Sequence, residues 1–352
     1  MSNFKVLFIC KKRVDSYGIS FGLLNSASMI CESLGKVGIE SSVVCPVDAN
    51  GIDKEVYNYK PTHVVIHAIW VPPEKIRELC RRYPSIVWNI RIHSKPAFLA
   101  MEGIASDWIG EYSNVQLGNH NFWLSANSVE TYELVKDIFR ARSVMLPNTY
   151  TKPAPPADSD LTRTKVNFQE SSLNVACFGA IRPLKNTYAQ AAAAIRLANR
   201  MNLHLDFHIN SGREEQGGDR VTKNLKSMFS ETHHNLIEHD WYSHSVLVYN
   251  ILPKMDLGMQ VSMTETFNIV AADMVAAGVP TIGSDDIYWM SWLFHSDPNN
   301  LDQMGRKLRL AKALGKFGVW LNKIGLIRAN KKAVLVWMKY LNDSANCLTK
   351  MN

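Results

Sequence analysis

Two carboxylates in the stretch Met263–Ser284 are the first candidates for chemistry in this chain. Glu265 lies in a polar loop, and Asp273 lies in a run of small and apolar residues, 269–277, that predicts a buried helix. A carboxylate on a buried helix needs a partner, because an unpaired buried charge is costly. Asp273 is therefore held by protein donors or meets a ligand, and periodicity leaves both open. Glu265, just before the helix, could cap it by accepting backbone N–H groups.

Two cations form a second candidate group. Arg182 and Lys185 follow a predicted strand, 173–179, and precede a predicted helix, 187–201. Cations at such a strand–helix junction are placed to grip a diphosphate. Lys and Arg are common in surface loops, so a merely solvated role stays open.

A third group follows the predicted strand 86–92. His93 could act as an acid, a base or a hydrogen-bond donor to a hydroxyl. Arg91 and Lys95 beside it could hold an anion. A solvated or structurally bonded histidine is the equally weighted alternative.

The loop 15–22 follows the first predicted strand, 4–10, and contains Gly18 and Gly22. These glycines would let a ligand or a facing loop approach the backbone closely. A tight turn is the alternative, and the loop lacks the Gly-x-Gly-x-x-Gly pattern of dinucleotide sites.

The elements that must position these residues alternate between strand and helix, which predicts a doubly wound parallel sheet. In such sheets ligands bind at the carboxyl ends of the strands. The alternation of strands and helices predicts a first domain over residues 1–150, a proline-rich linker over 151–172 and a second domain over 173–324. Two further helices are expected in the tail, at 304–326 and 333–341.

Composition describes an ordinary globular protein with 46% hydrophobic and 20% charged residues, and 352 residues favour two domains. The six cysteines are scattered, with no Cys-x-x-Cys pair and no histidine at metal-ligand spacing. No apolar run is long enough to cross a bilayer, and the N-terminus does not resemble a secretion signal. We predict a cytoplasmic protein with no metal site.

The positive charge is concentrated in the tail. From residue 301 to 352 there are 11 Lys or Arg and two acids, hence 11 − 2 = +9, and the other 300 residues sum to 7 − 9 = −2. Three interpretations stay open: a solvated helix that returns to the first domain, an interfacial helix on an anionic membrane, and a nucleic-acid surface.

Taken in order over most of residues 1–290, these pieces resemble the retaining nucleotide-sugar glycosyltransferases of the GT-B fold, most like family 4. Glu265 and Asp273 match the spacing of the family's Glu-x7-Glu motif, followed by Ala-Ala-Gly-Val-Pro. The segment 179–185 is similar to the family's diphosphate-binding loop. Ser-Ala-Asn-Ser, ending at residue 128, and Leu-Pro-Asn, ending at residue 148, are similar to the family's signatures in the N-terminal domain. In three places the chain departs from the family: Asp273 replaces Glu, Phe-Asn replaces Phe-Gly at 267–268, and Ala180 stands where an Arg is usual.

The resemblance implies two Rossmann-like domains facing across a cleft, with a C-terminal helix (about 325–352) crossing back to the first domain. It implies catalytic roles for Glu265, His93, Arg182 and Lys185, with Asp273 on the donor ribose. The implied donor-binding residues are Ser20, Gly22, Gly179, Thr266, Phe267, Asn268, Ile269 and Asp273. The implied acceptor-side residues are Tyr17, Arg91 and Lys95. No metal and no cofactor besides the donor is implied.

The first-domain motifs Tyr-Gly-Ile-Ser-Phe-Gly-Leu and Arg-Ile-His-Ser-Lys-Pro also look like glycosyltransferases carried by bacterial viruses. Several of those modify hydroxylated bases of viral DNA. We therefore predict transfer of a hexose or pentose from a UDP-sugar, with retention, to a hydroxymethylated base in double-stranded phage DNA in the host cytoplasm. The alternatives are lipid-linked or polysaccharide acceptors at a membrane surface, and a non-catalytic sugar-nucleotide binder. No obligate protein partner is inferred.

Overall fold

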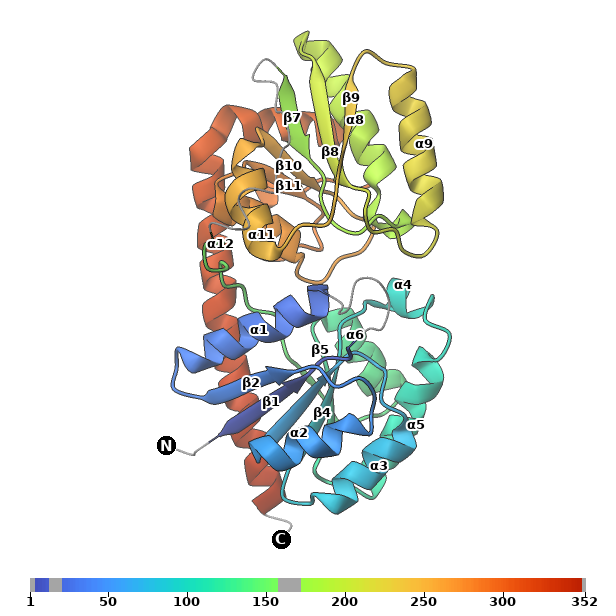
Figure 1. Ribbon diagram of the computed structural model, residues 1–352, viewed down its shortest axis with the longest axis vertical. Helices are drawn as coiled ribbons and strands as arrows, with labels where there is room; N and C mark the ends of the chain where they lie inside the picture. Colours follow the sequence, from blue (N-terminus) through green and yellow to red (C-terminus); the bar gives the residue numbers. More distant parts are fainter. Residues whose placement is uncertain (1–3, 13–20, 158–171, 350–352) are drawn as a thin grey trace. The chain divides into compact units, whose positions relative to one another are not determined.

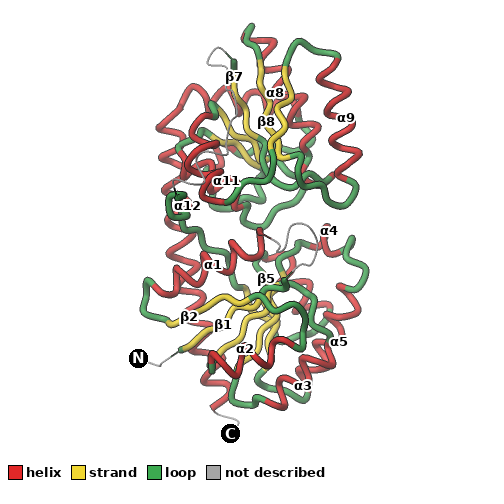
Figure 2. Tube along the Cα trace, in the orientation of Figure 1, coloured by secondary structure: helices red, strands yellow, loops and turns green. Residues whose placement is uncertain are grey.

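In the computed structural model of the chain, residues 4–12, 21–157 and 172–349 are described. The chain divides into two compact units, drawn in Figure 1. Unit 1 comprises residues 1–151 and 329–352, and unit 2 comprises residues 152–328. Figure 2 shows the strands of each unit with helices on both sides.

Unit 1 contains a six-stranded parallel sheet in the order β2-β1-β3-β4-β5-β6. Its strands are β1 (Lys5–Ile9), β2 (Glu40–Val44), β3 (His63–His67), β4 (Val87–Ile92), β5 (Phe122–Ala126) and β6 (Ser143–Met145). Its helices are α1 (Phe21–Gly35), α2 (Gly51–Tyr59), α3 (Pro73–Arg82), α4 (Pro96–Leu99), α5 (Ala105–Leu117) and α6 (Val129–Glu133), the last continuing as a π-helical turn (Leu134–Ile138).

Two features of unit 1 escape the sequence pattern. Helix α2 buries only Ile52 and Val56, which is too little apolar periodicity to reveal it. The sequence pattern predicts a single helix over residues 100–112, whereas the structure has the short α4 followed by α5 from Ala105.

Both faces of the unit 1 sheet are buried, as parallel sheets require. Along β1, Leu7 and Ile9 belong to one apolar cluster, while Val6 and Phe8 belong to another. The second cluster includes Trp337 of the C-terminal helix α12 (Leu301–Thr349). The chain's last helix is therefore part of the core of its first domain.

Unit 2 contains a five-stranded parallel sheet in the order β11-β10-β7-β8-β9. Its strands are β7 (Leu173–Ala176), β8 (Leu205–Asn210), β9 (Asn235–His239), β10 (Leu257–Gln260) and β11 (Thr281–Gly283). Its helices include α8 (Thr187–Met201), α9 (Gly218–Ser230), α10 (His244–Val246) and α11 (Ile269–Ala277). Short 3-10 or π-helical segments occur at Pro183–Lys185, Leu247–Ile251, Leu252–Lys254 and Trp292–Phe294. The prediction of two doubly wound, Rossmann-like domains is confirmed.

The predicted break between the two tail helices, after residue 326, is in the wrong place, because the kink of α12 is at Gly315. Helix α12 is continuous between residues 326 and 333, and its one non-helical residue is Gly315, with φ +46°. No Gly or Pro occurs in 327–332 to end the helix. Residues 301–328 of α12 belong to unit 2, and the rest belongs to unit 1.

Replacement of Trp337 by Ala should lower the free energy of unfolding by about 3–5 kcal/mol. Its side chain is fully buried against Phe8, and its indole N–H donates to the carbonyl of Pro147 at 2.9 Å. Urea unfolding measures the change. Leu335→Ala is the matched control, because Leu335 lies on the same helix with 66% exposure. Equal losses in the two variants would contradict this account.

Candidate functional site

The strand order of unit 2 reverses between β7 and β10. Strands β8 and β9 lie on one side of β7, whereas β10 and β11 lie on its other side. Ligands of open α/β sheets bind at such a switch point, outside the carboxyl ends of the strands. The loop after β7 contains Gly179, Arg182 and Lys185, and the loop after β10 contains Glu265. The four predicted residues therefore lie at the same edge of one sheet.

Lys185 and Glu265 form an ion pair between Nζ and Oε1. Both side chains are largely withdrawn from solvent, with 16% and 9% exposure. A pair so shielded is stronger than a surface pair, since little water screens it. The pair places a cation that can bind an anion beside a carboxylate that can accept hydrogen bonds from hydroxyl groups.

Arg182 pairs with a residue that sequence reasoning missed. Its Nη1 lies 3.3 Å from Oε2 of Glu215, and Arg213 donates its Nε–H to the other oxygen, Oε1, at 2.7 Å. Arg213 also lies over the ring of Trp241, 5.1 Å from the ring centroid. One carboxylate thus orients two guanidinium groups at this edge. The sequence shows that the loop 211–219 is rich in glycine and charged residues, but it does not show that Glu215 of this loop pairs with Arg182.

Two glycines permit this arrangement. Gly179 has φ +125°, a conformation that side chains disfavour, and its N–H donates to Oδ1 of Asn210 at 3.0 Å. A Cβ on Gly218 would lie 2.1 Å from the carbonyl oxygen of Ile181. The loops after β7 and β8 therefore touch through their backbones.

Buried amides connect the loops after β7 and β10. Gln190 donates to the carbonyl of Lys185 and accepts from the N–H of Val261, both at 2.8 Å. The N–H of Met263 donates to the carbonyl of Leu184 at 2.9 Å. The ion-pair partners are thus positioned by hydrogen bonds on either side of them.

The expectation that Glu265 caps α11 is wrong. Asn268 is the cap: its Oδ1 accepts from the N–H of Ala271 at 2.9 Å, and its φ is +56°. The N–H of Glu265 instead donates to Oδ2 of Asp286 at 2.7 Å. Asn tolerates the left-handed conformation better than most residues, which explains why it replaces the glycine usual in the resembling family.

The other predicted donor-binding residues of this loop differ in burial. Phe267 is 1% exposed, and its ring packs against Trp289, so only its backbone can face a ligand. The carbonyl of Phe267 accepts from the indole of Trp289 at 2.7 Å. Thr266 is half-buried in the loop, and Ile269 begins α11.

Asp273 is 1% exposed, and its Oδ1 lies 2.8 Å from Nε2 of His244. The partner that its burial requires is therefore a protein group, which sequence reasoning did not identify. Ser243, which caps α10, marks the turn but gives no sign of the pairing. The ribose role of Asp273 stays a prediction.

In unit 1, His93 follows β4 and meets His67 at the end of β3. Their Nε2 and Nδ1 atoms lie 3.0 Å apart, and Nη1 of Arg91 lies 3.3 Å from the same Nε2 of His93. Burial and the charge of Arg91 hold the pKa of both histidines well below the ordinary value, and His67 adds to the effect on His93. Both rings are therefore neutral at pH 7.

The contacts also assign the tautomers. Within the described residues, Nε2 of the fully buried His67 has no hydrogen-bond partner. A bare lone pair costs less than a bare N–H, so the proton of His67 is on Nδ1 and is donated to His93. Nη1 of Arg91, which can only donate, lies 3.3 Å from Nε2 and 3.5 Å from Nδ1 of His93, so it is the donation from His67 that makes Nε2 the acceptor. The proton of His93 is then on Nδ1, the atom left to donate to a ligand.

Arg91, predicted as an acceptor-side cation, has its side chain inside the first domain, and its role toward an acceptor stays a prediction. It is fully buried, and its Nη2 donates to Asn148 Oδ1 at 2.6 Å and to the carbonyl of Leu146 at 2.8 Å. All six residues of β4 are buried, so a strand-end position does not imply exposure here. Nζ of Lys95 lies 2.8 Å from Oε1 of Glu130. Burial by itself would raise the pKa of Glu130, but the contact with Lys95 outweighs it, so the pKa is lowered.

The remaining predicted residues belong to the first loop. Tyr17 and Ser20 lie outside the described residues. Gly22 is in the first turn of α1, and a Cβ there would meet no atom within 4 Å.

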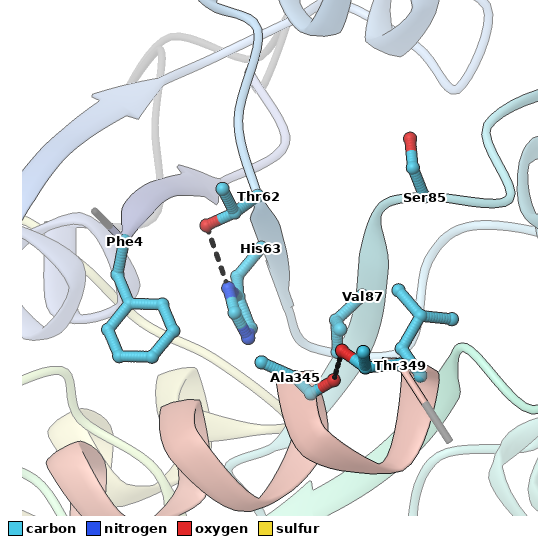
Figure 3. Close-up of a pocket in the computed structure, with 8 residues that line it drawn as sticks. Phe4, Thr62, His63, Ser85, Val87, Ala345 and Thr349 are labelled. Atoms are coloured by element: carbon cyan, nitrogen blue, oxygen red, sulfur yellow. Dashed lines mark hydrogen bonds between the residues drawn. The ribbon is translucent and has the colours of Figure 1, made fainter. Parts of the chain in front are cut away.

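A small cavity of about 280 Å³ lies elsewhere in unit 1 (Figure 3). Phe4, Thr62, Val87 and Ala345 are among its lining residues, at the amino end of the sheet. His63 in its wall is bonded to Thr62 and Ser344. The cavity is thus remote from the carboxyl edge that carries the candidate residues.

Within residues 4–12, 21–157 and 172–349, no group of three His, Cys, Asp or Glu could hold a metal ion. None of the described helices combines the length and apolar character needed to cross a membrane.

No protein-family model and no curated protein sequence matches the chain. Solved structures do. A UDP-forming trehalose-phosphate synthase from Burkholderia xenovorans has a TM-score of 0.66 at 10% identity, covering 98% of this chain and 99% of that one. Sucrose-phosphate synthase from Thermosynechococcus elongatus scores 0.64 at 12% identity, covering 97% and 98%. Anabaena HepE in complex with UDP scores 0.63 at 11% identity, covering 97% and 100%.

This chain has the GT-B fold. The structural neighbours are GT-B glycosyltransferases, and the GT-B fold predicted from the sequence is confirmed. At these identities the likeness establishes the fold of the chain.

His67 and His93 should remain neutral at about pH 5.5, where a free histidine with a pKa of about 6.5 is mostly protonated. Because the unfolded chain binds protons that the folded chain does not, the free energy of unfolding should fall as the pH drops below about 6.5. Nitrogen-15 NMR of the imidazole rings and urea unfolding against pH measure both effects.

His67→Asn is the matched variant, since its amide can still donate to His93 but does not titrate. It should weaken the pH dependence of stability. A charged imidazolium signal from His93 at pH 5.5, or a stability independent of pH, contradicts the assignment.

Proposed function

We propose that this GT-B protein is a glycosyltransferase that moves a sugar from a UDP-sugar to an acceptor hydroxyl with retention of configuration. The ion pair of Lys185 and Glu265 at the switch point of the unit 2 sheet is the observation that carries the proposal. UDP in the HepE structure and the UDP-forming synthase among the neighbours support this donor class.

In this proposal the cations act on the leaving group. Departure of the nucleoside diphosphate builds negative charge, which Lys185 and Arg182 stabilise without a metal ion. Arg213 contributes through the carboxylate that it shares with Arg182. The N-terminus of α11 adds backbone N–H groups and the positive end of its dipole.

The carboxylates and His93 act on the sugar and the ribose. Glu265, released from Lys185 as the diphosphate binds, accepts hydrogen bonds from sugar hydroxyls. Asp273 reaches the ribose while His244 orients it. The contact of His93 to the transferred sugar is made by its Nδ1–H, because Nε2 accepts from His67.

The acceptor is proposed from the sequence resemblance alone: a hydroxymethylated base in double-stranded phage DNA, modified in the host cytoplasm. Of the predicted acceptor-side cations, Arg91 is buried and Lys95 pairs with Glu130, while Lys11 and Lys12, which follow the first strand, are exposed and could contact DNA phosphates. Lipid-linked and polysaccharide acceptors belong in the same test.

That test incubates the protein with labelled nucleotide sugars, with and without hydroxymethylated DNA, lipid extract and polysaccharide. Label in DNA supports the proposed acceptor, and label in another acceptor replaces it. A chelator should leave the rate unchanged. A protein that neither transfers nor hydrolyses any donor would be a binder rather than an enzyme.

Glu265→Gln should lower kcat about 10²- to 10³-fold, the cost of removing one preorganised polar group from an active site. Lys185→Ala should weaken UDP binding about 10- to 100-fold, the worth of a hydrogen bond to a charged group. Transfer or donor-hydrolysis rates and calorimetry with UDP measure these effects.

Glu214→Ala is the control, because Glu214 is an exposed carboxylate one residue before Glu215. It should change neither quantity. If Glu265→Gln keeps the wild-type rate while thermal unfolding is unchanged, Glu265 has no role in transfer.

A further inference from the structure

A stripe of cationic and apolar side chains lies on α12 within unit 2. Lys316, Trp320, Lys323 and Ile327 recur at spacings of four, three and four residues, which places them on one face of the helix. Phe317 stacks on Trp320, with ring centroids 5.5 Å apart and planes 26° apart. These five residues are called the α12 stripe.

The opposite face of the helix is packed against the segment 289–294. Oδ1 of Asn322 accepts from the N–H of Ser291 at 3.0 Å. A Cβ on Gly325 would lie 2.0 Å from the carbonyl oxygen of Trp289. This close packing fixes the rotation of the helix, so the α12 stripe cannot turn inward.

The apolar members of the stripe are half exposed: 55% for Phe317, 53% for Trp320 and 54% for Ile327. Single exposed apolar residues are ordinary, but a row of three on one helix face is the pattern of an interaction surface. Trp292, on the neighbouring segment, is 75% exposed.

The charge that α12 itself carries between its two acidic residues has one sign. The 40 residues between Asp302 and Asp343 contain ten Lys or Arg and no acid. Within the described part of the chain, Lys316 and Lys323 make no ion pair or hydrogen bond. A complementary partner must therefore offer negative charge next to apolar material.

We propose that the α12 stripe binds the surface of an anionic lipid bilayer. Aromatic rings favour the headgroup level, isoleucine favours the acyl boundary below it, and lysine reaches the phosphates above. The helix would lie in the plane of the surface. This binding is independent of sugar transfer and of the donor site.

A nucleic acid fits the stripe less well. Base stacking needs free ring faces, whereas Phe317 and Trp320 stack on each other. The stripe has no Asn, Gln, Ser or Thr to read base edges, and Ile327 would have no role.

Cosedimentation with vesicles tests the proposal. The full chain should bind vesicles made of equal parts of phosphatidylglycerol and phosphatidylcholine. It should bind much more weakly to vesicles of phosphatidylcholine alone. Lys316→Gln with Lys323→Gln should weaken binding to the anionic vesicles about 25-fold, at about five-fold per lysine. Phe317→Ala with Trp320→Ala should weaken binding to the same vesicles by at least about ten-fold, because the buried ring area is lost.

Lys223→Gln, at an exposed lysine on α9, and Tyr57→Ala, at a 74% exposed aromatic on α2, are the matched controls and should bind like the wild type. Circular dichroism and calorimetry with UDP establish that the stripe variants keep their fold and donor site. Equal binding by stripe variants and controls, or no vesicle binding by the wild type, overturns the proposal. So does a stripe-dependent complex with DNA or with a second copy of the chain in the absence of vesicle binding.

Discussion

The parallel pairing of β10 with β7 is the constraint on which the candidate site depends. Parallel strands end at one edge of a sheet, so the loops that follow these two strands emerge side by side. That geometry brings Lys185 to Glu265 across 80 residues of sequence. The strand order reverses at the same place, which leaves the edge free of a crossing connection. Every other part of the site in unit 2 either supports these two loops or adds charge to them.

Neutral amides hold the charged groups in position. Gln190 and Asn186 bond the loop after β10, and Asn268 caps α11 while donating to Gln260 at 2.9 Å. A buried amide satisfies backbone donors and acceptors at a lower desolvation cost than an ion does. The charged side chains are thus oriented before a ligand arrives, which is the condition for electrostatic stabilisation of a leaving diphosphate. A similar arrangement occurs in unit 1, where the amide of Asn148 accepts from the buried Arg91 and His93 is partly exposed.

Helix α12 has two different environments along its length. In unit 1 it contributes Trp337 to the core, which makes the folding of the first domain depend on the end of the chain. In unit 2 its packed face is set by small residues such as Gly318 and Gly325, and its other face carries the α12 stripe. Small residues allow close backbone approach and leave the bulky side chains outward. The end of the basic tail therefore stabilises the core of unit 1, whereas its earlier part, within unit 2, presents an exposed face.

The sequence by itself determined the two α/β domains and the order of the charged motifs, because the periodicity that reveals strands and helices is a local property. Only the tertiary structure decided that Asp273 pairs with His244, that Asn268 rather than Glu265 caps α11, and that Arg91 is buried. It also decided that α12 is continuous through residues 327–332. Partners, burial and helix continuity depend on which segments pack together, and packing between distant segments leaves no periodic trace in the chain.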